Sequence, residues 1–468
     1  MFFSCSIIAI MRKVLYILIA LFAFCNTVSC EEVQKTGIEL IDLSFEQAYQ
    51  LMLENNNSLK AYNEAIEQSK FEKRAALGEF SPKVGMNTTY IHFSEDMTLH
   101  TPVTLPGISM TTTSLVQEQN VFGLGGSVVW NIFTGGKLLS NHAAARAKFE
   151  ASNAKYKEIK DTLTVELVKR YYGLRLAREV ADVRLKNMEC VEQHLKDAKL
   201  LEQEGIISKA ERLHAEVAYS NAKRDYDASL RDINIVEEGL KSLIKSDNAD
   251  LKNIRIQPGS ILAIYSDFSI NLDEMKANAI QNNPQLKQLK EKRNAMNAKY
   301  HAKVADYMPT VSLFATDIFA SSHLSEAVPH AAIGGTANWL LFDGLKRENN
   351  LIAAKHERQM VDYEIEDARY NIESLVVKQY QELMKHKENY DSSKQALEKA
   401  QEALRVADLS FREGYGTSLQ VTDAQTMLLK VQTDRLNAIY NFDVALTDLL
   451  KTNGDTDEIL NYISKEQD

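Results

Sequence analysis

The sequence predicts a mainly α-helical protein whose long coiled-coil helices are joined to four short strands that contribute to a β-barrel. Three observations lead to this fold class. The chain is internally duplicated, each half holds a very long stretch almost free of glycine and proline, and each half holds two β-prone runs of about ten residues. With only 19 glycines and 7 prolines among 468 residues, the composition favours long helices over a turn-rich β fold.

The N-terminus has the features of a targeting segment. Arg12-Lys13 precedes the apolar run 14–24, which has the length of a signal-peptide core and is too short to span a bilayer comfortably. Residues 1–10 precede these positive charges and are interpreted as an upstream extension, with Met11 as the true start. We therefore expect residues 1–30 to be a signal peptide and the protein to leave the cytoplasm.

The cysteines do not indicate a disulfide scaffold. Cys5 and Cys25 are expected to be lost with the signal peptide, so that Cys190 and Cys30 are the cysteines left to consider. Cys30 loosely resembles the acylated cysteine of a lipoprotein signal, although Thr27 stands where such a signal has leucine. Lipidation of Cys30 and ordinary cleavage near it are the two alternatives.

The mature chain contains an internal repeat. Four motifs recur in the same order in two halves of about 200 residues: Asn55–Lys60 with Asn282–Lys287, Glu79–Val84 with Asp306–Val311, Trp130–Lys137 with Trp339–Lys346, and Glu204-Gly205 with Glu413-Gly414. The sequence divides accordingly into a first repeat (31–250), a linker (251–271), a second repeat (272–453) and a C-terminal tail (454–468).

Each repeat predicts three helices. They are a helix of about 35 residues, a very long helix, and a returning helix of about 35 residues: Ser44–Leu77, Lys137–Gln203 and Lys209–Leu243, then Asp273–Val304, Leu345–Arg412 and Leu419–Leu450. Apolar residues recur every seven positions on the long helices, from Leu167 to Leu195 and from Val376 to Phe411, as in a coiled coil. At 1.5 Å per residue, each long helix spans roughly 100 Å, and the two shorter helices could stack end to end beside it.

Four runs have the length of a tilted strand that crosses a bilayer, and a polar loop separates the two runs of each pair. They are Val84–Phe93, Leu124–Phe133, Val311–Ala320 and Ile333–Phe342. Aromatic residues sit toward their ends, as in the belts that meet lipid headgroups; Trp130, Phe133, Trp339 and Phe342 are the candidates. A small soluble sheet is the alternative, but the signal peptide and the flanking helices favour a membrane-spanning sheet.

A spanning sheet must close into a barrel, because lipid cannot satisfy a free strand edge. Four strands per chain cannot close alone when the smallest such barrels have about eight. Two, three or four copies would give eight, twelve or sixteen strands, and the residues by themselves do not choose among these numbers.

These features together resemble the TolC family of outer-membrane efflux and secretion channels. The resemblance rests on the Pro-strand junctions at Pro82 and Pro309, the strand exits Trp130–Gly135 and Trp339–Gly344, and the C-terminal stretch Gly414–Leu449. It implies a homotrimer in the outer membrane, with a twelve-stranded β-barrel and a periplasmic α-helical barrel. It also implies a periplasmic adaptor, a membrane fusion protein, that docks on the helix tips, and an inner-membrane pump or ABC transporter that supplies energy.

The resemblance assigns some candidate site residues. In the family, two acidic residues three positions apart line the periplasmic constriction; Asp423 matches the second, Gln420 stands at the first, and Gly416 replaces a latch arginine. A surface acid is the alternative role for Asp423. The residues expected to contact the adaptor lie at the hairpin tips and are Gly205, Ile206, Ile207, Gly414, Tyr415 and Gly416. Ser208 and Thr417 are the expected N-caps of the returning helices.

Other classes of protein fit less well. A net charge of −10 argues against a nucleic-acid binder. No nucleophile elbow, zinc-protease motif or phosphate loop is complete in the sequence, so neither an enzyme nor a cofactor or metal site is expected. The runner-up is a soluble periplasmic coiled-coil adaptor or scaffold, which would normally have one helical hairpin where this chain has two.

Overall fold

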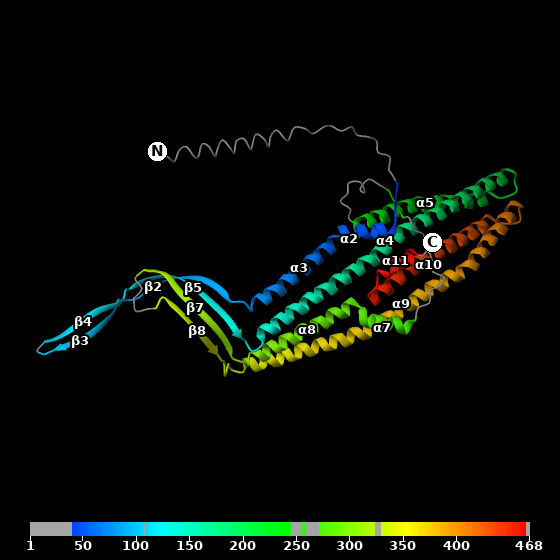
Figure 1. Ribbon diagram of the computed structural model, residues 1–468. Helices are drawn as coiled ribbons and strands as arrows, with labels where there is room; N and C mark the ends of the chain where they lie inside the picture. Colours follow the sequence, from blue (N-terminus) through cyan, green and yellow to red (C-terminus); the bar gives the residue numbers. More distant parts are fainter. Residues whose placement is uncertain (1–39, 107, 245–254, 259–270, 323–328, 465–468) are drawn as a thin grey trace, which may run out of the picture.

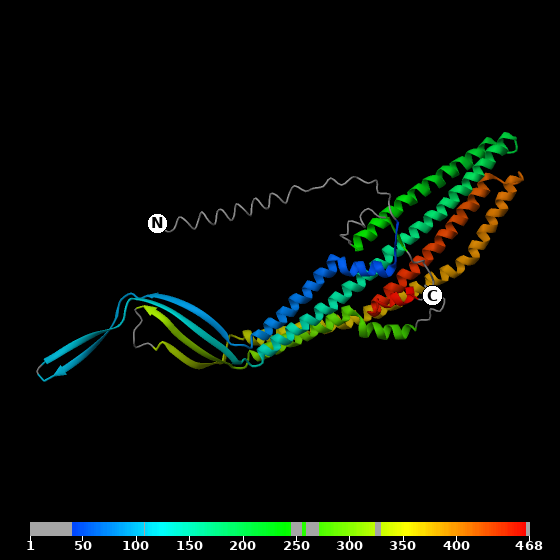
Figure 2. The ribbon, with the colours of Figure 1, turned by 45° about the horizontal axis from the view of Figure 1, so that its top comes forward.

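The computed structural model describes residues 40–106, 108–244, 255–258, 271–322 and 329–464. The signal-peptide prediction and Cys30 therefore lie outside the described residues. The described chain is a long rod with a sheet at one end and two helical hairpin tips at the other (Figures 1 and 2). The C-terminal helix lies part-way along the rod (Figure 1).

The first repeat contains β1 (Leu40–Leu43), α2 (Phe45–Asn55), α3 (Asn57–Gly78), β2 (Lys83–His92), β3 (Met97–Leu105), β4 (Ile108–Gln117), β5 (Asn120–Phe133), α4 (Lys137–Gln203) and α5 (Lys209–Ile244). β6 (Arg255–Pro258) follows, within the predicted linker, and pairs in parallel with β1. The second repeat contains α7 (Leu272–Asn282), α8 (Pro284–Ala305), β7 (Thr310–Ser322), β8 (Ala331–Asn338), α9 (Lys346–Arg412) and α10 (Ser418–Asn453), and α11 (Glu458–Ser464) ends the described chain.

The long helices α4 and α9 confirm the helix prediction within one residue at each end. Positions of the predicted heptads that include Leu167, Leu174, Val376, Leu383 and Phe411 are fully buried, which is the arrangement that a sevenfold apolar repeat favours. The shorter helices α3 and α5 both pack on α4, as their combined length suggested, and α8 and α10 pack on α9 and also on α4. The two halves therefore share α4 as a common packing partner.

The prediction of one continuous helix at the start of each repeat was wrong, because an asparagine interrupts both. Asn56 separates α2 from α3 and Asn283 separates α7 from α8, and each side chain caps the helix that follows. Each amide also donates to a carbonyl near the end of the returning helix, Asn56 to Leu243 at 3.1 Å and Asn283 to Thr452 at 2.9 Å. The repeated Asn motif thus forms the junction between three helix ends in each half.

The main core surrounds the first of these junctions. Phe45 of α2 lies against Tyr171 and Tyr172 of α4, with ring centroids 5.4 and 6.0 Å away. Tyr171 is fully buried, and its hydroxyl donates to the Leu43 carbonyl at 2.7 Å, which fixes β1 against the bundle. A second, smaller cluster around Phe411 and Val421 lies behind the tips.

The sheet differs from the sequence prediction in two places. The predicted polar loop after β2 is a β-hairpin, β3–β4, whose strands pair antiparallel. The fourth strand, predicted to reach Phe342, ends at Asn338. β8 has only β7 as a neighbour among the described strands, and the ladder stops where Pro309 precedes β7, since proline has no N–H to donate. Beyond that point Arg347 donates to the carbonyls of Leu340 and Leu341, at 2.7 and 3.3 Å.

No helix among the described residues is both long and apolar enough to cross a bilayer.

Replacement of Asn56 by alanine should loosen the α2–α3 junction, because it removes both a helix cap and a buried hydrogen bond. We expect a local loss of about 1–3 kcal/mol, seen as faster amide hydrogen exchange in the first turn of α3 and the last turn of α5. The neighbouring Asn57→Ala changes an exposed amide and serves as the matched control. Equal exchange in the two variants would contradict the role of Asn56.

Candidate functional site

Among the described strands of a single chain, the four-stranded sheet has two free edges. Its order is β2–β5–β7–β8, and every neighbouring pair is antiparallel. β2 and β8 therefore run in opposite directions, so that β8 of one copy can pair with β2 of another and continue the antiparallel pattern. This arrangement satisfies the geometric requirement for a barrel that is closed by several copies.

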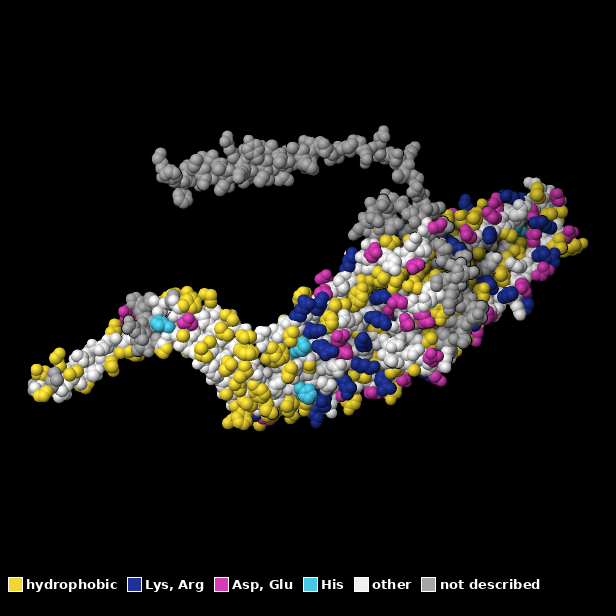
Figure 3. Space-filling view, in the orientation of Figure 1, with side chains coloured by type: hydrophobic (Ala, Val, Ile, Leu, Met, Phe, Trp, Pro, Cys, Tyr) yellow, Lys and Arg dark blue, Asp and Glu magenta, His cyan; other side chains and the backbone are white. Residues whose placement is uncertain are grey.

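The register divides the side chains of the sheet between an apolar and a more polar face, because cross-strand partners share a face. The mainly apolar face carries Val84, Met86, Tyr90, Phe122, Leu124, Val128, Trp130, Leu313, Ala315 and Ile333, together with Asp317 past the middle of β7 and the polar residues Thr88, His92 and Asn120. The opposite face carries Asn87, Thr89, Ser127, Asn131, Ser312, Thr316 and Thr336 among a few apolar residues. Figure 3 shows hydrophobic side chains over the sheet and charged ones over the helices. The alternation matches a barrel wall with lipid outside and water inside.

The aromatic residues predicted as a belt lie at the end of the sheet next to the helices. The Trp130 indole donates to the Phe80 carbonyl at 2.9 Å, and the Trp339 indole donates to the Tyr307 carbonyl at 3.1 Å. Phe133 ends β5, whereas Trp339 and Phe342 follow the end of β8. All four predicted belt residues are exposed, from 43 to 73%. A membrane-interface role for them remains a prediction.

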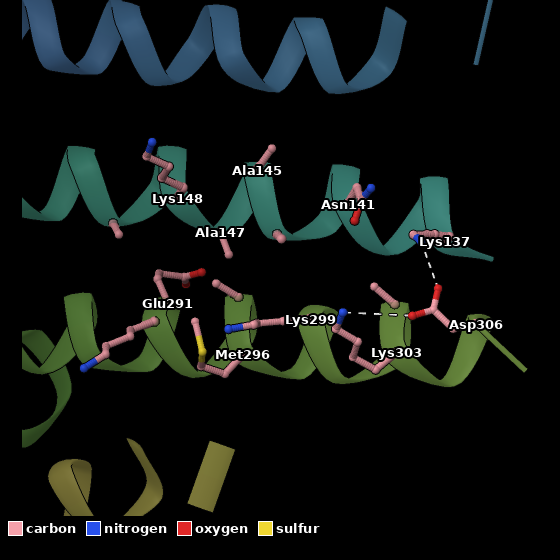
Figure 4. A pocket seen from close by; sticks show the side chains of 15 residues that line it. Lys137, Asn141, Ala145, Ala147, Lys148, Glu291, Met296, Lys299, Lys303 and Asp306 are labelled. Atoms are coloured by element: carbon pink, nitrogen blue, oxygen red, sulfur yellow. Dashed lines mark hydrogen bonds and ion pairs between the residues drawn. The ribbon is translucent and has the colours of Figure 1, made fainter. Parts of the chain in front are cut away.

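A groove of about 670 Å³ lies between α4 and α8, just below the sheet (Figure 4). Ala147, Ala295 and Met296 are among its apolar lining residues. The five lysines around it, Lys137, Lys148, Lys292, Lys299 and Lys303, are each in an ion pair with a carboxylate. Lys137 of the first repeat meets Asp306 of the second at 2.8 Å. This ion pair beside the groove joins the two halves of the chain next to the sheet.

The hairpin tips have the predicted geometry. Gly205 and Gly414 adopt positive φ angles of 74° and 79°, which the tight helix reversals need. Ile206 is 53% exposed and Tyr415 is 89% exposed, whereas Ile207 is only partly exposed and packs on the tip cluster. Two of the three predicted contact side chains therefore face outward.

The turn into α10 explains two departures from the family pattern. Thr417 caps α10 in a capping box, in which Gln420 accepts from the Thr417 amide at 3.0 Å. A Cβ atom at Gly416 would lie 2.9 Å from the Phe411 nitrogen, so that the turn itself excludes a side chain there. Asp423, one helical turn beyond Gln420, is exposed on α10. The structure thus gives Gln420 a capping role, and the role of Asp423 as a constriction residue remains a prediction.

Sequence reasoning missed the contact that joins the two hairpins behind the tips. His194 of α4 is 2% exposed, its Nε2 lies 2.8 Å from the Ser418 hydroxyl of α10, and its ring centroid is 4.5 Å from that of Phe411. Glu211 of α5 accepts from the Ser418 amide at 2.7 Å, and Arg412 reaches Asp197 at 3.2 Å. Only the heptad position next to Leu195 could have indicated that this histidine is buried.

Burial lowers the pKa of His194 below its ordinary value of 6.5, and the Arg412 cation acts in the same direction, while Asp408, Asp197 and Glu211 oppose the shift. Nδ1 has no hydrogen-bond partner among the described residues. Neutral His194 with its proton on Nε2 therefore fits the site, whereas a charged ring would bury an unpaired N–H. When the contact opens, His194 is released from this burial and binds a proton more readily than in the packed site. The contact is therefore stable at neutral pH and weakens as pH falls below 6.5.

Acidification from about pH 7.5 to about pH 5.5 should loosen the contact between the hairpins. We expect amide protection in the first turns of α10, corrected for intrinsic exchange rates, to fall in the native protein. His194→Gln keeps a neutral donor and should remove most of this pH dependence. His214→Gln, at an exposed position on α5, is the matched control and should retain it. An unchanged pH profile in His194→Gln would contradict the assignment.

Comparisons with known proteins agree with this geometry. The family described as outer membrane efflux protein matches residues 48–244 and 277–455. The outer membrane efflux protein BepC of Brucella suis is 21% identical over 327 residues, which cover 69% of this chain and 70% of BepC. The CmeC outer membrane channel of Campylobacter jejuni superimposes with a TM-score of 0.73 at 17% identity, covering 94% of this chain and 95% of CmeC. VceC of Vibrio cholerae gives 0.72 at 14% identity, covering 88% and 96%.

The fold, the sheet and the family match lead to one conclusion. The protein is an outer-membrane channel and not an enzyme, with a helical part in the periplasm and strands that contribute to a β-barrel in the membrane. Expectations of fold class, location and resemblance to the TolC family are confirmed by these findings. The chain belongs to the outer membrane efflux protein family.

Proposed function

We propose that three copies of this chain form a passive export duct of a tripartite efflux pump or type I secretion system. The observation that carries a barrel of several copies is the open sheet with oppositely directed edge strands, β2 and β8, and the number three follows from the resemblance to the TolC family. Three copies close twelve strands into a barrel, and a barrel of this size exceeds the eight strands whose interior side chains just fill it. The polar face then lines a water-filled lumen, and the apolar face contacts outer-membrane lipid.

The helices continue the duct into the periplasm. The 67 residues of α4 and of α9 span about 100 Å each, and the shorter helices cover their length in two pieces. The duct closes at rest through the hairpin tips. Contacts such as His194 with Ser418 hold the hairpins of one chain together, and a change in these contacts opens the periplasmic end.

The tips are the docking site for a periplasmic adaptor of the membrane fusion protein class. Ile206 and Tyr415 expose apolar surface at the ends of helices that are otherwise strongly charged. Gly205, Gly414 and Gly416 keep these turns narrow, so that the hairpin tips of a helical adaptor can approach them. By the resemblance to the TolC family, an inner-membrane pump or ABC transporter supplies the energy.

Asp423 is proposed as the ion-selective part of the periplasmic constriction. Threefold symmetry would place three carboxylates in one ring, which favours cations over anions. Gln420 lies one turn closer to the tip and contributes no charge, so that the ring has a single layer of carboxylates.

Planar-bilayer recordings of the purified protein test this function. We expect stable, cation-selective conductance steps, with a severalfold loss of cation preference in Asp423→Asn because the carboxylate ring is removed. Asp434→Asn, at an exposed position on the same helix three turns away, is the matched control.

The possible failures are separable. Recovery as a soluble monomer without conductance would contradict the channel and favour the coiled-coil adaptor or scaffold. Conductance with unchanged selectivity in Asp423→Asn would support the channel but contradict the role of Asp423 in the constriction. Asp423 would then be a surface acid.

A further inference from the structure

The β3–β4 hairpin forms an arm beyond the sheet, at the end opposite the helices (Figures 1 and 2). We define the arm as the strands β3 and β4, residues 97–105 and 108–117. It continues the β2–β5 pair, since the Phe93 amide donates to the Gln119 carbonyl at 2.8 Å between the two pairs of strands. Because the helices are periplasmic, the arm lies on the outer side of the membrane.

The arm contains no aspartate, glutamate, lysine or arginine, although a quarter of the chain is charged. Charges resume directly at its base, with Glu95, Asp96 and Glu118. An exposed loop outside a cell would ordinarily keep charged side chains for solubility. The absence of charge along the whole arm therefore indicates that part of its surface is covered.

The register gives the arm two different faces. Leu99 pairs with Ser114 and Val103 with Met110, so that these side chains share one face with Ile108. On the opposite face His100 pairs with Thr113, and their side chains are hydrogen-bonded at 2.8 Å. Thr98, Thr104, Ser109 and Thr111 share that face, which is mainly polar and also carries Pro102 and Leu115.

The apolar face is uncovered in the single chain. Leu99, Ile108 and Met110 are 58, 61 and 63% exposed, and Figure 3 shows hydrophobic side chains at the far end of the arm. A two-stranded hairpin with no further partner is at best marginally stable in water. The arm therefore needs a surface to cover this face.

We infer that the partner is the same face of the arms on the other two copies, packed around the channel axis outside the membrane. This inference rests on the proposed trimer. The arm grows from β2, the edge strand that would pair with the next copy, so that the interface between copies continues directly into it. Identical uncharged arms can converge without repulsion, and their polar faces of threonine and serine then face water.

The dimensions permit this contact. A barrel of twelve strands spaced about 4.8 Å apart and tilted by about 40° has a radius of about 12 Å. Nine residues of extended chain in β3 reach about 30 Å. An inclination of roughly 25° would then bring the three arm ends together over the mouth.

The lipid surface fits the arm less well. The arm has no lysine or arginine with which to bind lipid phosphates. The carboxylates of Glu95, Asp96 and Glu118 at its base would meet an anionic surface unfavourably if the arm folded down onto it. Packing among copies avoids both problems.

Cysteine cross-linking between the arms tests the inference. In a Cys190→Ser background, Met110→Cys places a thiol on the apolar face and Thr111→Cys places one on the polar face, one residue away. Purified protein in lipid nanodiscs is treated with a short bis-maleimide, beside the parent without an added cysteine. We expect covalent dimers between copies in Met110→Cys at several times the yield in Thr111→Cys.

The outcomes separate this inference from the proposed function. A protein that is not trimeric before cross-linking would contradict the proposed function itself. A trimer in which neither variant cross-links, while both thiols react equally with a monofunctional maleimide, would overturn the packing of the arms. A Met110→Cys thiol that is shielded in nanodiscs, reactive in detergent and never cross-linked would place the arm on lipid and also overturn it.

Discussion

A sheet that crosses a lipid bilayer cannot leave the backbone groups of its edge strands unpaired, since hydrocarbon offers them no hydrogen-bond partner. In this chain that constraint falls on β2 and β8, which border the four-stranded sheet and have no second neighbour within the described residues. Other features of the molecule follow from it. The strands must come from several copies, the copies must align their helices, and each chain must carry two similar halves that place the strands side by side.

Equivalent residues make equivalent contacts in the two halves of the chain. Asn56 and Asn283 each cap a helix and bind the end of a returning helix, and Trp130 and Trp339 each bind a carbonyl two residues before a proline. The halves differ at the outer side, where only the first carries the described β3–β4 arm. They differ again at the strand exit, where Leu345 replaces Gly136 at a position with positive φ. With these differences, two similar halves form one sheet with two different edge strands, β2 and β8.

The sequence was sufficient for the long elements and insufficient for the short ones. Helices α4 and α9 were predictable because coiled-coil periodicity and the scarcity of Gly and Pro act over many turns. The helix breaks were missed because an asparagine at a helix start and one inside a helix look alike until its tertiary partner, the Leu243 or Thr452 carbonyl, is known. The β3–β4 arm was missed because its threonine-rich strands resemble a polar loop.

The candidate site residues also differ in whether the local sequence is enough to predict their roles. Glycines that need positive φ, such as Gly205 and Gly414, could be assigned from the local pattern alone. The pairing of His194 with Ser418 could not, because 224 residues separate them in the chain. The capping role of Gln420 could have been predicted from Thr417 three residues before it, since that spacing is the capping box. Asp423 cannot be assigned from one chain, because a ring of carboxylates exists only between copies.

We propose that the four strands of one chain close into a barrel with those of two further copies. Native mass spectrometry of the protein extracted from membranes in mild detergent tests it most directly, because the mass counts the copies in each particle. We predict a single dominant species of three chains. A dominant monomer, or a species of two or four chains, would contradict it.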